Sequence, residues 1–200
     1  MKLIKLDGIK PWLPRNSIDA TLKLEGQFVI PDMEFDGQKL TWNGSGSFKA
    51  TTGLPGFQMP ENQCIKDSGP IPEGVYKVLV TDRGAAKDDG AGRCNLSPGW
   101  GVQTIPRGAA AGSCEAYWAN WGQNRARMEP ADAQTRIACN PVRSGFYLHD
   151  STKGFSHGCI EVEHRFFPIL RSKAKSSSRS YFILKVNYVP ARVTNGGTRA

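Results

Sequence analysis

Short runs of alternating polar and apolar residues recur along the chain, each bounded by turn-forming residues, and this pattern predicts β-strands. The first run covers residues 20–31. Residues 38–42 lead into Asn43-Gly44, a hairpin signal, and residues 46–52 provide the return strand. Three further strands are expected at residues 75–80, 144–149 and 181–189.

The segments between these strands carry weaker signals. Residues 81–113 are rich in glycine and proline and are expected to form a long irregular excursion. Residues 114–121 predict one or two helical turns, which Gly122 would end. A short helix is expected from 161 to about 175, with Pro168 limiting its length, and a flexible tail at 190–200. The pattern predicts a mainly β protein with a few short helices and a single domain, 1–200.

Composition narrows the class of protein. The 200 residues are 39% hydrophobic and 22% charged, which excludes collagen, coiled coils and wholesale disorder. The formal net charge of +8 fits a polyanionic partner, either nucleic acid or an acidic cell envelope. No apolar run approaches the roughly 18 residues that a membrane span needs. The charges at Lys2, Lys5, Asp7 and Lys10 interrupt any export signal.

The chain contains five cysteines. An odd number fits two disulfides and one free thiol, and four paired cysteines allow three connectivities. Disulfides would imply an oxidising compartment, whereas five reduced cysteines would fit the cytosol. The count alone leaves both interpretations open.

The candidate catalytic residues are concentrated in residues 145–160. Cys159 follows Gly158, where the chain can turn sharply and present a thiol. A free thiol is a weak nucleophile at neutral pH and needs a base. His149 lies ten residues upstream, at the end of a predicted strand, and His157 lies two residues from the cysteine. Backbone N–H groups of Gly158 and Cys159 would stabilise an oxyanion. The pattern indicates a Cys/His acyl-transfer site.

Other interpretations remain. Cys159 would also suit a core as a small hydrophobe. A zinc site would use Cys139, His149, His157 and Cys159, although their spacing matches no usual structural pattern. A papain-like order is disfavoured because only His164 follows the cysteine. The basic stretch 171–179 allows a zinc-stabilised nucleic-acid-binding protein, but it lacks interleaved aromatic residues and fits a solvated face better.

Residues 149–160 (HDSTKGFSHGCI) resemble the active-site signature of the L,D-transpeptidase family, and most closely the L,D-transpeptidase-like effectors of bacterial type VI secretion systems. The likeness extends to 121–125 (WGQNR) and 143–149 (RSGFYLH). Upstream, LTWNGSGSFKATTGLPG and GPIPEGVYKV also resemble the N-terminal half of that family. The resemblance therefore covers about residues 40–163.

This resemblance implies a β-sandwich or barrel with Cys159 as nucleophile and His149 as general base at the mouth of a groove. It implies that the substrate pocket and its oxyanion site involve Trp121, Arg143, Ser156, His157 and Gly158. Arg143 would position the loop or meet a substrate carboxylate. Asp150 stands where relatives often carry glycine; it would orient His149 or, as we expect, be solvated.

The implied substrates are peptidoglycan stem peptides, attacked through a thioester. Hydrolysis makes the protein an L,D-carboxypeptidase that removes the terminal D-Ala of tetrapeptides, and a free D-amino acid gives exchange. No metal or cofactor is implied. Made in the producer's cytoplasm without a signal peptide, this antibacterial toxin would be injected by a type VI apparatus, directly or through an adaptor, into the target periplasm. A cognate periplasmic immunity protein would plug the groove. The implied disulfide-forming cysteines are Cys64, Cys94, Cys114 and Cys139.

Two other functions remain as alternatives to this effector. One is an inactive module that only binds peptidoglycan. The other is a housekeeping L,D-transpeptidase that crosslinks the wall. Neither a nucleic-acid partner nor a membrane span is expected.

Overall fold

The computed structural model describes residues 22–24 and 27–200, in two units, Met1–Ile30 and Pro31–Ala200. The stretch analysed for an export signal lies outside the described residues. The single strand expected at 20–31 is wrong, because two strands lie there, β1 (Leu22–Leu24) and β2 (Gln27–Val29), which pair antiparallel. The barrel described below belongs to the unit Pro31–Ala200, and the single domain over 1–200 stays a prediction.

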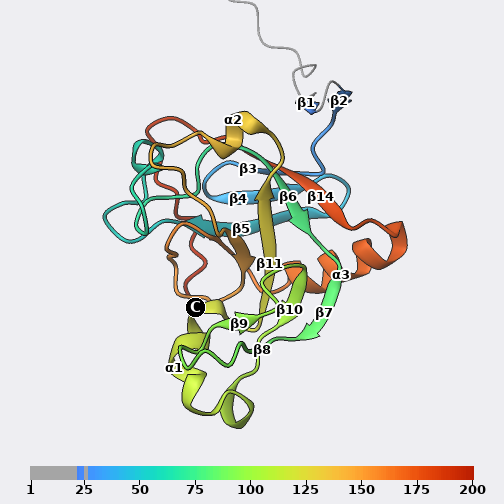
Figure 1. The fold of residues 1–200 in the computed structure, drawn as a ribbon. Coiled ribbons are helices and arrows are strands. Elements are labelled where there is room, and N and C mark those ends of the chain that lie inside the picture. Colours follow the sequence, from blue (N-terminus) through green and yellow to red (C-terminus); the bar gives the residue numbers. More distant parts are fainter. Residues whose placement is uncertain (1–21, 25–26) are drawn as a thin grey trace, which may run out of the picture. The chain divides into compact units, whose positions relative to one another are not determined.

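Eight strands of this unit close into a barrel, so the prediction of a mainly β fold with a few short helices is confirmed (Figure 1). Their order is β12–β13–β5–β4–β3–β14–β6–β11, and β11 pairs back with β12. The strands are β3 (Met33–Phe35), β4 (Lys39–Trp42), β5 (Gly46–Thr52), β6 (Gly74–Leu79), β11 (Asn124–Pro130), β12 (Tyr147–His149), β13 (Ile160–Val162) and β14 (Tyr181–Val186).

The hairpin of β4 and β5 is confirmed with its predicted turn, since Trp42 pairs with Gly46. β6 confirms the strand expected at 75–80 with a shift of one residue, and β12 and β14 confirm the other two with shorter bounds. The excursion 81–113 is less irregular than expected. It contains β7 (Asp82–Ala85) and β10 (Val102–Thr104), which extend the sheet beyond β11, and a small ladder of β8 (Lys87–Asp88) with β9 (Leu96–Ser97).

Helical segments lie between the strands. The turns expected at 114–121 are confirmed as α1 (Glu115–Trp118) and a 3-10 turn, η4 (Ala119–Trp121), which ends at Gly122 with φ +76°. Shorter elements are η1 (Pro60–Asn62), η2 (Gly108–Ala110), η3 (Gly112–Cys114) and α2 (Ala133–Arg136). None of the described helices is long and apolar enough to cross a membrane.

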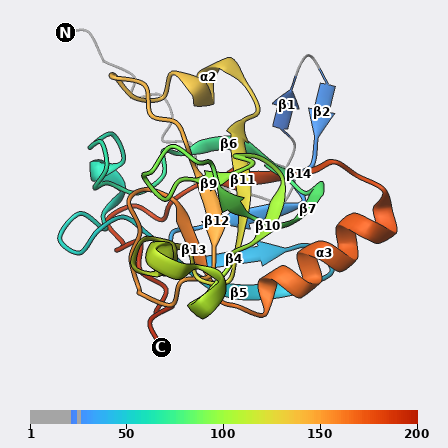
Figure 2. The ribbon, with the colours of Figure 1, turned by 60° about the horizontal axis from the view of Figure 1, so that its bottom comes forward.

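The long helix, α3 (Phe166–Ser177), begins later than predicted because Glu161 belongs to β13 (Figure 2). Pro168 is the third residue of the helix and does not limit its length. In the first turn a missing N–H leaves no helical hydrogen bond unmade. Phe166 is fully buried, with its ring centroid 5.3 Å from that of Phe48 and 5.8 Å from that of Trp42.

The flexible tail expected at 190–200 is wrong. Thr194 is fully buried, and its carbonyl accepts the N–H of Thr52 at 2.9 Å. Asn195 forms a bridge with Thr51, and the buried hydroxyl of Thr198 donates to Glu161. Polar residues without apolar periodicity form an ordered segment here because their backbone and hydroxyl groups bond to residues 50–52 of β5, beyond the stretch that pairs with β4.

Thr198→Val removes one of the hydrogen bonds to the buried Glu161 carboxylate and should lower the free energy of unfolding by about 1–3 kcal/mol. For a domain of this size that corresponds to a fall in Tm of roughly 2–4 °C per kcal/mol, measured by calorimetry. Thr198→Ser keeps the hydroxyl and is the matched control. Equal melting of the valine variant and the wild type would mean that the segment is not anchored as described.

Candidate active site

The parallel pairing of β12 with β13 positions the chemically interesting residues. Leu148 pairs with Ile160, and His149 pairs with Glu161. Leu148 and Ile160 are fully buried in the barrel core. Because side chains alternate along a strand, His149 and Glu161 share the opposite, outer face.

The antiparallel neighbour β11 extends this outer face. Arg125 pairs with His149 and Arg127 pairs with Tyr147, while Ala126 between them points into the core. Paired residues of adjacent strands lie on the same side of a sheet. The outer face of β11, β12 and β13 therefore carries two arginines, a tyrosine, a histidine and a glutamate side by side.

A pocket of about 330 Å³, which we call the thiol pocket, opens beside this face. One wall comes from the segment that ends in α1 and η4, which lies in front of β13 in Figure 2: Arg93, Cys94, Asn95, Tyr117, Asn120 and Trp121. The other wall comes from β12 and the loop before β13: His149, Lys153, Phe155, Ser156, His157 and Cys159.

The turn that presents Cys159 is tightly specified. Gly158 has φ +104°, and a Cβ on it would overlap the guanidinium of Arg143, so only glycine fits. The Ser156 hydroxyl donates to the carbonyl of Cys159 and accepts the N–H groups of Gly53 and Gly158, each at 3.3 Å. Ser156 thus fixes the shape of this turn through its hydroxyl, and Cys159, at the end of the turn, lines the pocket.

Burial controls the protonation of both groups. It raises the pKa of the Cys159 thiol to about 11, although the backbone of Tyr147 and the charges of Arg125, Arg127 and Arg143 act to lower it. Burial also lowers the pKa of His149 to about 4. Thiol and imidazole are therefore both neutral near pH 7, and the imidazole is free to accept a proton.

His149 is held in place by packing. It is 3% exposed, and its Nδ1 is buried with no hydrogen-bond partner among the described residues. The ring of Trp121 lies edge-on to the imidazole at 5.7 Å between centroids. Trp121, singled out from the sequence, therefore fixes the orientation of the imidazole as well as lining the pocket.

Arg143 does not reach the thiol pocket. Its guanidinium donates to the backbone carbonyls of Gln63, Gly69 and Pro70 behind the Gly158 turn. Of its two predicted roles, the geometry therefore fits loop positioning, with a cationic field toward Cys159. His157 lines the pocket as an exposed residue and its Nδ1 contacts the carbonyl of Asp67 at 2.9 Å.

The expectation that Asp150 is solvated is wrong. It is 3% exposed, and its carboxylate accepts the N–H groups of Gln123 and Asn124 and the Asn124 side chain. The exposed His164 contacts it at 2.8 Å. These partners occupy both oxygens, so Asp150 fixes the start of β11 and makes no hydrogen bond to the His149 side chain. A Cβ at Gly122 would overlap its backbone.

Two residues of the site were not singled out from the sequence. Glu161 is fully buried beside His149 and accepts from Ser151, Lys153, Gly154 and Thr198. Its position two residues after Cys159 was the available signal, although the sequence predicted a helix there and the structure has β13.

Arg125 is the second, and it was quoted only as part of a motif. It is 3% exposed, its Nε donates to Gln103, and its guanidinium lies over the rings of Trp121 and Tyr147 at 4.9 and 4.7 Å. The aromatic faces compensate for its burial. A buried cation is thereby held beside the site.

The structure pairs the four remaining cysteines as Cys64–Cys139 and Cys94–Cys114, and leaves Cys159 free. The second disulfide braces the wall of the thiol pocket through Cys94. The first joins Cys139 to the segment beside Gln63, which accepts from Arg143. Both disulfides therefore stabilise loops that surround Cys159.

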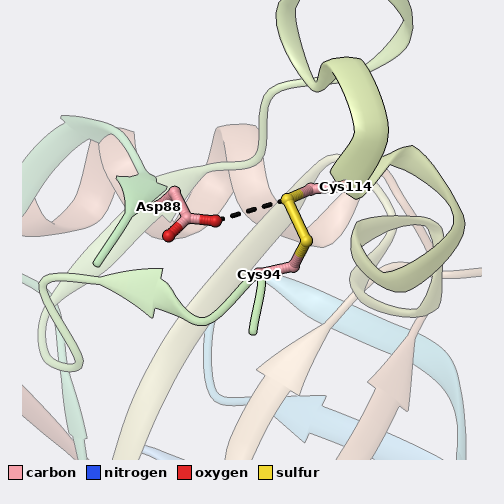
Figure 3. A group of neighbouring side chains, drawn as sticks. All are labelled: Asp88, Cys94 and Cys114. Atoms are coloured by element: carbon pink, nitrogen blue, oxygen red, sulfur yellow. Dashed lines mark hydrogen bonds between the residues drawn. A yellow bond between two sulfur atoms is a disulfide. The ribbon is translucent and has the colours of Figure 1, made fainter. Parts of the chain in front are cut away.

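The described residues contain one group with metal-ligand spacing, Asp88, Cys94 and Cys114 (Figure 3). The Asp88 carboxylate lies 3.3 Å from the Cys114 sulfur. Both sulfurs are joined in the disulfide, and a metal ligand must be a thiolate. The alternative zinc set is not assembled either, because Cys139 is paired with Cys64.

Comparison with protein-family models finds none that matches this chain, and comparison with curated proteins finds no match either. The geometry of the site therefore carries the functional argument.

Alkylation of Cys159 by iodoacetamide tests the protonation states. A thiol pKa near 11 predicts a rate that rises about tenfold per pH unit from pH 7 to 10, because the thiolate is the reactive form. The other cysteines are in disulfides, and Cys159→Ala gives the background by mass spectrometry. A rate plateau reached below pH 8 would show a preformed thiolate–imidazolium pair instead.

Proposed function

We propose that the unit Pro31–Ala200 is a cysteine-dependent peptidoglycan enzyme of the L,D-transpeptidase type, acting as an L,D-carboxypeptidase, as a D-amino acid exchanger, or as both. One observation carries the proposal. The single free cysteine, Cys159, lies directly before β13 and shares a pocket with His149 of the adjoining strand β12, whose Nδ1 has no hydrogen-bond partner among the described residues. The sequence resemblance supplies the substrate class.

The chemistry starts from the neutral pair. The Cys159 sulfur attacks the carbonyl carbon of the amide between an L-centre and the terminal D-amino acid, and its proton passes to His149. The imidazolium then protonates the leaving amine as the C–N bond breaks, which leaves a thioester. Water attacks the thioester to give a carboxylate and regenerate the thiol. A D-amino acid in place of water gives an exchanged peptide.

The surrounding charges support this sequence of steps. Arg125, Arg127 and Arg143 each favour an anion at Cys159. Negative charge develops on sulfur and on the carbonyl oxygen during attack, and preorganised positive charge stabilises it. Glu161 raises the pKa of His149 against burial, and so favours the imidazolium as it forms.

The proposal extends to location and partners. Two disulfides fit an oxidising compartment such as the periplasm. Delivery by a type VI apparatus, an antibacterial role and a periplasmic immunity protein that blocks the thiol pocket rest on the sequence resemblance alone.

The test is a digest of purified peptidoglycan fragments, read by mass spectrometry with and without an added D-amino acid. Wild type should remove terminal D-Ala from tetrapeptides, or replace it when a D-amino acid is supplied. Cys159→Ala and His149→Ala should each lose at least about a thousandfold in kcat/KM while remaining folded, as measured by circular dichroism. His164→Ala, at an exposed histidine outside the pocket, is the matched control.

Three other results of this digest would point to a different base or a different function. Equal turnover by His149→Ala would contradict the assigned base. Binding of peptidoglycan without any mass change would favour the inactive wall-binding module. Crosslinked peptide dimers as the main product would favour a housekeeping transpeptidase.

A further inference from the structure

A second pocket of about 500 Å³ adjoins the thiol pocket. The two share Lys153 and Phe155, which therefore form the partition between them. The far side of the second pocket is lined by Gln58, Asn195 and Arg199. The ordered C-terminal segment thus contributes directly to a cavity beside Cys159.

Lys153 is held in a defined position. Its backbone N–H donates to the buried Glu161 at 2.9 Å, and its ammonium group donates to the side-chain oxygen of Asn120 on the opposite wall. It lies close enough to His149 for its charge to oppose protonation of the imidazole. A long, mobile side chain is thereby fixed between the two pockets.

The linings of both pockets are cationic. They include Arg93, Lys153 and Arg199, and no aspartate or glutamate side chain among the described residues. None of the ion pairs in the described part of the chain involves these three residues. Unpaired positive charge that lines a pocket attracts an anionic ligand group.

We propose that Lys153 is a specificity-determining residue, which with Arg199 binds a carboxylate on the side chain of the residue whose carbonyl Cys159 attacks. The inference rests on the proposed function, since it needs an acyl donor seated at Cys159. With the scissile carbonyl in the thiol pocket, a long side chain on that residue passes Lys153 and enters the second pocket. The amides of Gln58 and Asn195 offer further donors there.

The experiment compares two tetrapeptides, one with meso-diaminopimelic acid at the third position and one with its side-chain carboxyl amidated. Wild type should prefer the free acid on the order of tenfold in kcat/KM, since one charge-assisted hydrogen bond is lost on amidation. In Lys153→Met the ratio should fall to within about twofold. Lys39→Met, at an exposed position on β4, should keep the wild-type ratio.

Binding of the same peptides to Cys159→Ala separates this inference from the proposed chemistry. A charge preference in binding that Lys153→Met removes would support the subsite even if no peptide were cleaved. Equal use of both peptides by wild type, or a preference that survives in Lys153→Met, would overturn the inference whether or not the peptides are cleaved.

Discussion

The buried carboxylate of Glu161 is the constraint on which the site depends. A buried carboxylate without hydrogen-bond donors is strongly destabilising. Here the donors come from the loop after β12 and from the C-terminal segment. Satisfying one group therefore fixes the loop that carries Lys153, the tail that carries Arg199, and the spacing of β13 from β12. That arrangement fixes the position of the Cys159 thiol relative to the His149 imidazole, because Cys159 directly precedes β13 and His149 ends β12.

Around this centre the barrel provides rigidity and the surrounding loops provide chemistry. Leu148 and Ile160 anchor β12 and β13 in the core. A shift of either strand's register by one residue would turn its core side chain toward the outer face. The disulfides Cys64–Cys139 and Cys94–Cys114 brace loops that have little core of their own. Burial then keeps the pair neutral, and the three arginines are arranged to act on charge that develops during reaction.

Local signals in the sequence predicted part of this. The Asn43-Gly44 turn gave the hairpin of β4 and β5, and Gly122 ended the helical turns. β11 was not among the predicted strands, and the burial of Arg125 in it depends on tertiary contacts with Trp121 and Tyr147 that the local sequence does not show. The predictions of a solvated Asp150 and of a flexible C-terminal tail were wrong for the same reason, since the hydrogen-bond partners of both lie far away in the sequence.

The proposed chemistry requires that Cys159 becomes acylated. Acylation can be measured by intact-mass spectrometry of wild type mixed with a stem tetrapeptide and quenched rapidly in acid, followed by peptide mapping. We expect a mass increase equal to the tripeptide acyl group, located on Cys159 and released by hydroxylamine. Consumption of the tetrapeptide with no adduct on Cys159, or with an adduct on another residue, would contradict it.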